Sequence, residues 1–233
     1  MPGELTTIVM IIFHLKLHIH VMVGLSIKLS SKESKLLYKL LVLGPISSYK
    51  LAQRENIPSA TAWRILKKLA EEGYAKKGYR SFYITPKGLI MLYKEVRDEN
   101  ARTHILQELK EKWKYEGDTQ DLKEFIENLI YLIENEQINV NHLCFNYPTA
   151  LAGFLYPFAE RFTERSKKVI AYYLLKMFPS VCLPNSCRAI ISINDKGEPY
   201  AIAVDCKKNG LKINYFCDEL KAFIAKNCQL KTT

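Results

Sequence analysis

The sequence lacks the short motifs by which many enzyme active sites are recognised. It contains no G-x-S-x-G, no Walker loop and no H-E-x-x-H, and no two carboxylates stand at a spacing that indicates acid–base catalysis. His104 and His142 are isolated, without a nearby nucleophile pattern. We therefore expect no catalytic site, no bound metal and no cofactor, and we do not expect an enzyme.

The sequence also lacks a C-x-x-C pair, although it contains six cysteines: Cys144, Cys182, Cys187, Cys206, Cys217 and Cys228. Their spacings do not match those of zinc knuckles, and only Cys144 has a histidine close by, at His142. We expect buried, reduced thiols. Disulfides within the C-terminal half and a metal site are the alternatives.

No basic residue precedes the apolar stretch from Ile8 to Leu29, and no small-residue cleavage site follows it. Lys16, His14, His18 and His20 interrupt this stretch, so we expect no membrane span. Apolar and polar residues alternate from Phe13 to Val21, which predicts a strand with one buried face. The extension 1–29 is therefore a strand or a start assigned too early, with Met10 or Met22 as the true first residue. We expect a cytoplasmic protein.

Excess positive charge is missing from most of the chain. From Asp98 to Thr233, 18 Lys and Arg balance 18 Asp and Glu, whereas residues 30–97 carry 14 Lys and Arg against five acidic residues. With 48% hydrophobic and 25% charged residues, the chain has an ordinary globular composition. Because Lys and Arg supply nucleic-acid affinity by neutralising phosphates, this asymmetry predicts a nucleic-acid-binding module joined to a neutral partner domain. The alternative is a basic helical face without a partner.

The basic window shows the pattern of a small folded module. Apolar spacing predicts a helix over Ser31–Leu43, ended by Gly44-Pro45, and a short helix over Tyr49–Glu55, which Ser47 and Ser48 are placed to cap. We expect Ser59 to cap a third helix that runs to about Glu72, with Ala62, Leu66 and Leu69 buried. Two extended segments follow at 74–77 and 81–84. Thr85 then caps a last helix, with Pro86 at its first position.

The stretches GPISSYKLAQRENIPSATAWRILKKLAEEGYAKK and YITPKGLIMLYKE resemble the winged helix-turn-helix domains of MarR-like and PadR-like regulators, over residues 31–96 only. This resemblance implies that helix 59–72 enters the major groove of DNA and that the wing, 74–84, lies on the backbone or in the minor groove. We expect Arg64 to read a base, and Lys67 and Lys68 to bind phosphates. Trp63 departs from the family pattern, and we expect it to be half-buried against the wing; the alternative is an exposed ring that stacks on a sugar or a base. The DNA-binding residues implied are Ser48, Lys50, Ser59, Thr61, Trp63, Arg64, Lys67, Lys68, Lys76, Lys77, Tyr79 and Arg80.

The neutral half carries three groups of predicted elements. Helices over Asn100–Trp113 and Asp118–Gln137 form a linking or dimerisation region at 98–140. The apolar stretch from Thr149 to Phe178 is helical and interrupted at Pro157. Strands at 189–193, 200–206 and 211–216 form a three-stranded antiparallel meander, and Asp218 caps a final helix. The aromatic cluster of this half fits a core better than a ligand pocket.

We therefore expect an α+β protein with an N-terminal extension (1–29), a winged helix-turn-helix (30–97), linking helices (98–140) and an α+β domain (141–233). The predicted function is a transcription regulator that binds double-stranded DNA as a homodimer. A small-molecule effector is left open as a further partner. The alternatives are a DNA-binding protein of genome maintenance without sequence preference, and an enzyme with a winged-helix docking module.

Overall fold

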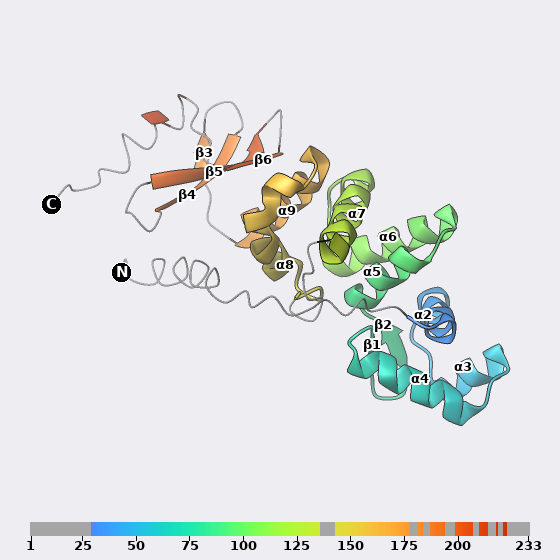
Figure 1. The fold of residues 1–233 in the computed structure, drawn as a ribbon. Coiled ribbons are helices and arrows are strands. Elements are labelled where there is room, and N and C mark those ends of the chain that lie inside the picture. Colours follow the sequence, from blue (N-terminus) through green and yellow to red (C-terminus); the bar gives the residue numbers. More distant parts are fainter. Residues whose placement is uncertain are drawn as a thin grey trace. The chain divides into compact units, whose positions relative to one another are not determined.

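The computed structural model describes residues 29–135, 143–177, 181–183, 187–193, 199–206, 210–213, 218 and 221–222. The predicted strand at Phe13–Val21 and most of the helix predicted after Asp218 lie outside these residues. The described chain divides into two compact units, a basic unit up to Pro148 and a C-terminal unit from Thr149 onward (Figure 1). Among the described residues, no helix has the length and apolar character needed to cross a membrane.

The basic unit begins with three helices whose ends are fixed by local hydrogen bonds. Helix α2 (Ser31–Leu43) has the predicted bounds, because Ser30 and Glu33 cap each other's backbone amides reciprocally. Helix α3 (Ser48–Glu55) starts one residue earlier than predicted, since Ser47 is the cap and its hydroxyl accepts from the Lys50 amide.

Helix α4 (Ser59–Glu71) corrects one sequence-based expectation. Ser59 is the first helical residue and not the cap, because Pro58 stands at the N-cap and no side chain caps this end. The tight turn before α4 is made by Asn56, which adopts a left-handed conformation with φ of 52°. The result is two helices joined by a short turn.

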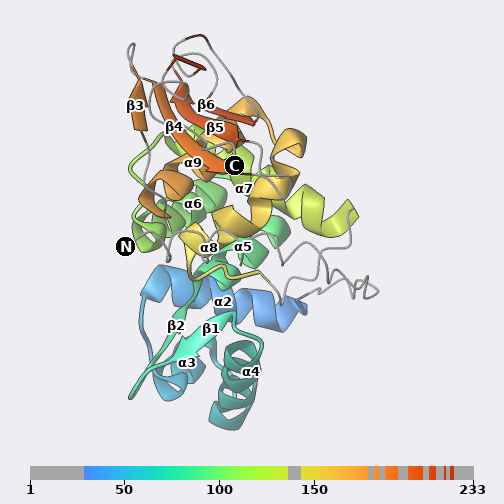
Figure 2. The ribbon, with the colours of Figure 1, turned by 90° about the vertical axis from the view of Figure 1, so that its left-hand side faces the viewer.

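A two-stranded antiparallel hairpin follows, made of β1 (Ala75–Lys77) and β2 (Phe82–Ile84), as predicted. Phe82 also exchanges two backbone hydrogen bonds with Ile46, in the segment before α3. This bridge joins the hairpin to the start of the helical pair, and the sequence analysis did not anticipate it. Figure 2 shows the hairpin beside α4.

Helix α5 (Pro86–Glu95) begins as predicted, with the Thr85 hydroxyl accepting from the Gly88 amide at 3.1 Å. Its start lies so close to the hairpin that only glycine fits at position 88. A Cβ there would stand 2.1 Å from the carbonyl oxygen of Tyr74. The contact fixes α5 against the residue that precedes β1.

Two longer helices, α6 (Glu99–Trp113) and α7 (Thr119–Asn135), complete the basic unit. They pack on each other through apolar stripes, and Trp113 meets Phe125 edge-on with ring centroids 6.2 Å apart. The indole N–H of Trp113 donates to the carbonyl of Phe145 at 2.8 Å, so the polar group of this buried ring is satisfied.

In the C-terminal unit, helix α8 (Pro148–Leu155), the 3₁₀ helix η3 (Tyr156–Arg161) and helix α9 (Glu164–Met177) precede a sheet. The sheet contains β3 (Val181–Leu183), β4 (Cys187–Ile193), β5 (Pro199–Cys206) and β6 (Gly210–Ile213), antiparallel and in chain order. The three predicted strands correspond to β4, β5 and β6, and the sheet has a fourth strand, β3, that was not predicted.

Helix α9 packs against β5 and β6. Small side chains on the sheet are fully buried, including Ala189, Ala201 and Ala203. The expectation of buried cysteines fails at Cys144, whose free thiol belongs to an exposed residue. The molecule is mostly helical with two small antiparallel sheets, consistent with the predicted α+β class.

Candidate nucleic-acid interface

Helix α4 presents one apolar face to the core and one polar face to solvent. Ala62, Leu66 and Leu69 are completely buried, as their helical spacing predicts. The opposite side exposes Ser59, Ala60, Trp63, Arg64, Lys67 and Lys68, while Thr61 is half-buried. The helix therefore offers small side chains at its N-terminal end and cations further along.

The three cations of α4 differ in their surroundings. Arg64 is exposed, and within the described residues it makes no ion pair. Lys67 pairs with Glu71 at 3.6 Å, but both side chains are 62% exposed. Such an exposed pair contributes at most about 1 kcal/mol and is screened by salt, so Lys67 remains available to a stronger anion.

Lys68 is engaged within the protein. Its ammonium lies 2.6 Å from the Glu33 carboxylate of α2 and 3.8 Å from that of Glu72. Burial by itself raises the pKa of Glu33, but hydrogen bonds from Lys68 and Ser30 outweigh burial and bring the pKa below its usual value. The hydrogen bond to Glu33 correspondingly raises the pKa of Lys68. Lys68 thus joins α4 to α2.

A second carboxylate fixes α2 against α3. Glu55 pairs with Lys35 at 3.0 Å and with Lys39 at 3.1 Å, and its side chain is only 6% exposed. The hydrogen bond from Lys35, and then that from Lys39, hold the pKa of Glu55 below its usual value against the effect of burial. Glu33 of α2 and Glu55 of α3 are therefore both ion-paired with lysines within the unit.

On α3, the remaining cations point to solvent. Lys50 and Arg54 are exposed, and Ser48 is half-buried at the start of the helix. Neither cation has an ion-pair partner in the part of the chain that the structure describes. Arg54 was not among the predicted site residues; its charge next to the turn before α4 was the available signal.

The hairpin tip is open and basic. Lys76, Lys77, Tyr79 and Arg80 are all exposed. Tyr79 is 91% exposed, and the Arg80 guanidinium lies 5.1 Å from the centre of the Tyr79 ring. The Gly78 amide donates to the Ser81 carbonyl at 2.7 Å, which closes the turn and holds these side chains at its outer end.

Trp63 connects α4 to the hairpin. Its ring meets the buried Phe82 edge-on at 5.7 Å, and the Lys77 ammonium lies 4.7 Å from the indole centre. Trp63 contacts the hairpin, but with 40% of the residue exposed it is an exposed side chain and not the half-buried one that was expected. The indole is therefore both a structural link and an accessible aromatic surface.

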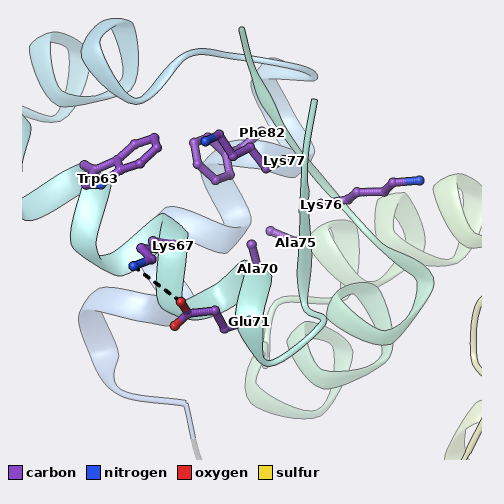
Figure 3. Close-up of a pocket in the computed structure, with 8 residues that line it drawn as sticks. All are labelled: Trp63, Lys67, Ala70, Glu71, Ala75, Lys76, Lys77 and Phe82. Carbon is purple, nitrogen blue, oxygen red and sulfur yellow. Dashed lines mark ion pairs between the residues drawn. The ribbon is translucent and has the colours of Figure 1, made fainter. Parts of the chain in front are cut away.

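A shallow groove of about 370 Å³ lies between α4 and the hairpin (Figure 3). It is lined by Trp63, Lys67, Ala70, Glu71, Ala75, Lys76, Lys77 and Phe82. Two aromatic rings and two alanines form its apolar walls. The three lysines among the lining residues are Lys67, Lys76 and Lys77. The sequence pattern indicates Trp63 and these lysines separately and contains no signal that brings them to one groove.

The structure thus distributes the twelve predicted residues over α3, α4 and the hairpin. It brings Trp63, Lys67, Lys76 and Lys77 to one groove, and it places Lys68 on Glu33. No three potential metal-ligating side chains gather within the described residues. The arrangement offers cations and one accessible indole to an anionic, aromatic ligand.

No family model and no curated protein matches the chain. The structure of wild-type ZitR from Lactococcus lactis aligns with a TM-score of 0.28 and 20% identity, covering 55% of this chain and 94% of that one. A mutant form of the same protein aligns with a TM-score of 0.28 and 18% identity, covering 58% of this chain and 96% of that one.

Proposed function

We propose that the basic unit is a winged helix-turn-helix that binds double-stranded DNA, and that the protein regulates transcription. Helix α4 enters the major groove, and the β1–β2 hairpin contacts the backbone or the minor groove. The order of elements supports this proposal, because two helices joined by a tight turn precede a hairpin and a further helix.

The distribution of paired and unpaired charge carries the proposal. Between residues 30 and 90 the acidic side chains Glu33, Glu55, Glu71 and Glu72 all take part in ion pairs with lysines. The cations that have no carboxylate partner within the described residues include Lys50 and Arg54 on α3, Arg64 on α4, and Lys76 and Arg80 on the hairpin. These are the elements that a winged helix presents to a duplex.

Roles follow from side-chain chemistry. The planar guanidinium of Arg64 pairs with a guanine edge through two hydrogen bonds. Lys67, Lys50 and the hairpin cations Lys76 and Arg80 neutralise phosphates, and the exposed Ser59 hydroxyl lets the start of α4 approach the backbone closely. Lys68 acts by positioning α4 through Glu33. Ser48, Thr61, Trp63, Lys77 and Tyr79 complete the proposed contact surface.

We also propose that the protein binds as a homodimer. Two copies present two α4 helices to half-sites one helical turn apart, roughly 34 Å. Selection of bound duplexes from a random pool at physiological salt tests both parts of the proposal. We expect a palindromic motif; bound sequences without any common motif would instead indicate a DNA-binding protein without sequence preference.

A further inference from the structure

The groove between α4 and the hairpin is chemically different from the cationic surface around it. Trp63, Lys67 and Ala70 form one stripe of α4, and Ala75 and Phe82 face them from the hairpin (Figure 3). Its volume of about 370 Å³ falls in the range of roughly 300–1,000 Å³ that small organic groups occupy in proteins. A phosphate gains nothing from such apolar walls.

Charge around the groove favours an anionic ligand. Lys67 and Lys77 bring positive charge to the groove, whereas the Lys76 side chain extends away from it (Figure 3). Glu71, the one acid among the lining residues, is paired with Lys67 at 3.6 Å. The ligand that fits is therefore flat and apolar in one part and anionic on either side. A nucleotide of a DNA strand has this composition, since its base has a π-face and phosphates flank it.

An intact duplex does not offer this part of the nucleotide. In a duplex the faces of the bases are stacked on one another, and a protein reaches only base edges, sugars and phosphates. Stacking on an aromatic side chain requires a base that has left the helical stack. Trp63 provides such a surface, with 40% of the residue exposed.

We propose that this groove binds an unpaired base, in a single strand or in a locally opened duplex, with the base stacked on Trp63. The Lys77 ammonium, now 4.7 Å from the indole centre, moves from the ring to a flanking phosphate. The inference rests on the proposed function, because α4 and the hairpin deliver the DNA next to the groove. The inference adds that the protein prefers DNA with an unpaired base. Sequence-specific binding to a fully paired duplex does not require this preference.

The test compares a fully paired duplex, the same duplex with a central bulge of unpaired thymines, and oligothymidylate, each fluorescently labelled, by anisotropy with the full chain. We expect the bulged duplex to bind more tightly than the paired one. Trp63→Leu, which keeps an apolar side chain without an aromatic face, should weaken binding to the bulge and to oligothymidylate roughly tenfold. It should weaken binding to the paired duplex less than binding to the bulged duplex, so the preference for the bulge should shrink.

Trp63→Phe and Tyr49→Leu are the matched variants. Trp63→Phe keeps a stacking ring and should retain most of the preference, and Tyr49→Leu removes an exposed ring of α3 and should change nothing. Oligothymidylate should quench tryptophan fluorescence in the wild type but not in Trp63→Phe, whose remaining tryptophan, Trp113, is buried. Thermal unfolding shows that each variant is folded.

Equal affinity for bulged and paired duplexes, with Trp63→Leu acting alike on both, would overturn this inference and leave duplex binding intact. Failure to bind any of the three DNAs would overturn both proposals. Quenching of Trp63 by an acidic peptide, without any response to oligothymidylate, would assign the groove to a protein partner instead.

Discussion

The ammonium of Lys68 and the carboxylate of Glu33 lie 2.6 Å apart and join α4 to α2. Among the described residues, Lys67, the neighbour of Lys68 in the sequence, pairs only with an exposed carboxylate of its own helix. Two adjacent lysines of α4 therefore have different roles. One is held by a carboxylate of α2, and the other is available to an external anion.

This difference gives a test with a built-in control. Lys67→Ala should weaken binding to all duplexes similarly and reduce the slope of log K against log salt by about one unit, because one phosphate contact is lost. Lys68→Ala should lower the melting temperature more than Lys67→Ala does, because it leaves the buried Glu33 carboxylate without its cation. Anisotropy titrations and thermal unfolding measure the two effects. Identical behaviour of the two variants in both measurements would contradict the assignment.

Stability should fall in acid because Glu33 and Glu55 have lowered pKa values in the folded state. Each carboxyl contributes stability that is fully present above its unfolded pKa, near 4.5, and is lost as the pH falls through the lower folded value. Thermal unfolding of the wild type should therefore show a decline below this pH. Glu33→Gln and Glu55→Gln should be less stable at neutral pH and should show a shallower decline, and an unchanged acid profile in both would be evidence against these ion pairs.

Arg64 should determine sequence preference. Arg64→Ala should remove about 1–3 kcal/mol of discrimination at one base pair, while Arg64→Lys should keep general affinity and lose part of the preference, because an ammonium lacks the planar fork. Binding to the selected motif and to single-base variants of it measures this loss. If Arg64→Ala weakens all sequences by the same factor, Arg64 binds phosphate and not a base.

Gly88→Ala should destabilise the basic unit. The new Cβ would stand 2.1 Å from the Tyr74 carbonyl oxygen, so the start of α5 must move away from the hairpin, at a cost of about 1–3 kcal/mol. Gly153 in α8 is the control, because a Cβ there would meet nothing closer than Met177 at 3.9 Å. Gly153→Ala should stabilise that helix by about 0.5–1 kcal/mol. Denaturant unfolding checks both.

The hairpin tip should affect binding without affecting stability. Arg80→Ala and Tyr79→Ala alter side chains that contact only each other among the interactions described at the tip, and Tyr79 is 91% exposed. Surface substitutions of this kind usually change stability by less than about 0.5 kcal/mol. We expect unchanged melting temperatures and weaker duplex binding for Arg80→Ala. Full affinity in Arg80→Ala would remove the hairpin tip from the interface.

The elements of the basic unit were predictable where local chemistry decides them. The bounds of α2 and the start of α5 follow from caps at Ser30 and Thr85, and the buried stripe of α4 follows from helical spacing. Ser59 was misplaced as a cap because serine is favoured at both the cap and the first helical position, and the preceding Pro58 occupied the cap. Strand β3 was missed because three residues carry little periodicity by themselves, whereas β1 and β2, equally short, belong to a recognisable helix-turn-helix and wing pattern.

The candidate site was less predictable, because its main contacts join residues that are far apart in the sequence. The pair between Glu33 and Lys68 joins residues 35 positions apart, and the bridge between Ile46 and Phe82 depends on how the hairpin folds back. The composition shows that cations outnumber acidic residues. It does not show which cations form ion pairs with those acidic residues. Trp63 was predicted to be partly buried, but the groove that it forms with the hairpin required the structure.

The most direct test of DNA binding by the basic unit is the affinity of the full chain for duplex DNA, measured as a function of salt concentration. We expect log K to fall linearly with log salt, with a slope that corresponds to several phosphate contacts and that becomes shallower in the Lys67→Ala and Arg80→Ala variants. Absence of binding at low ionic strength, or an affinity that does not depend on salt, would contradict the proposed interface.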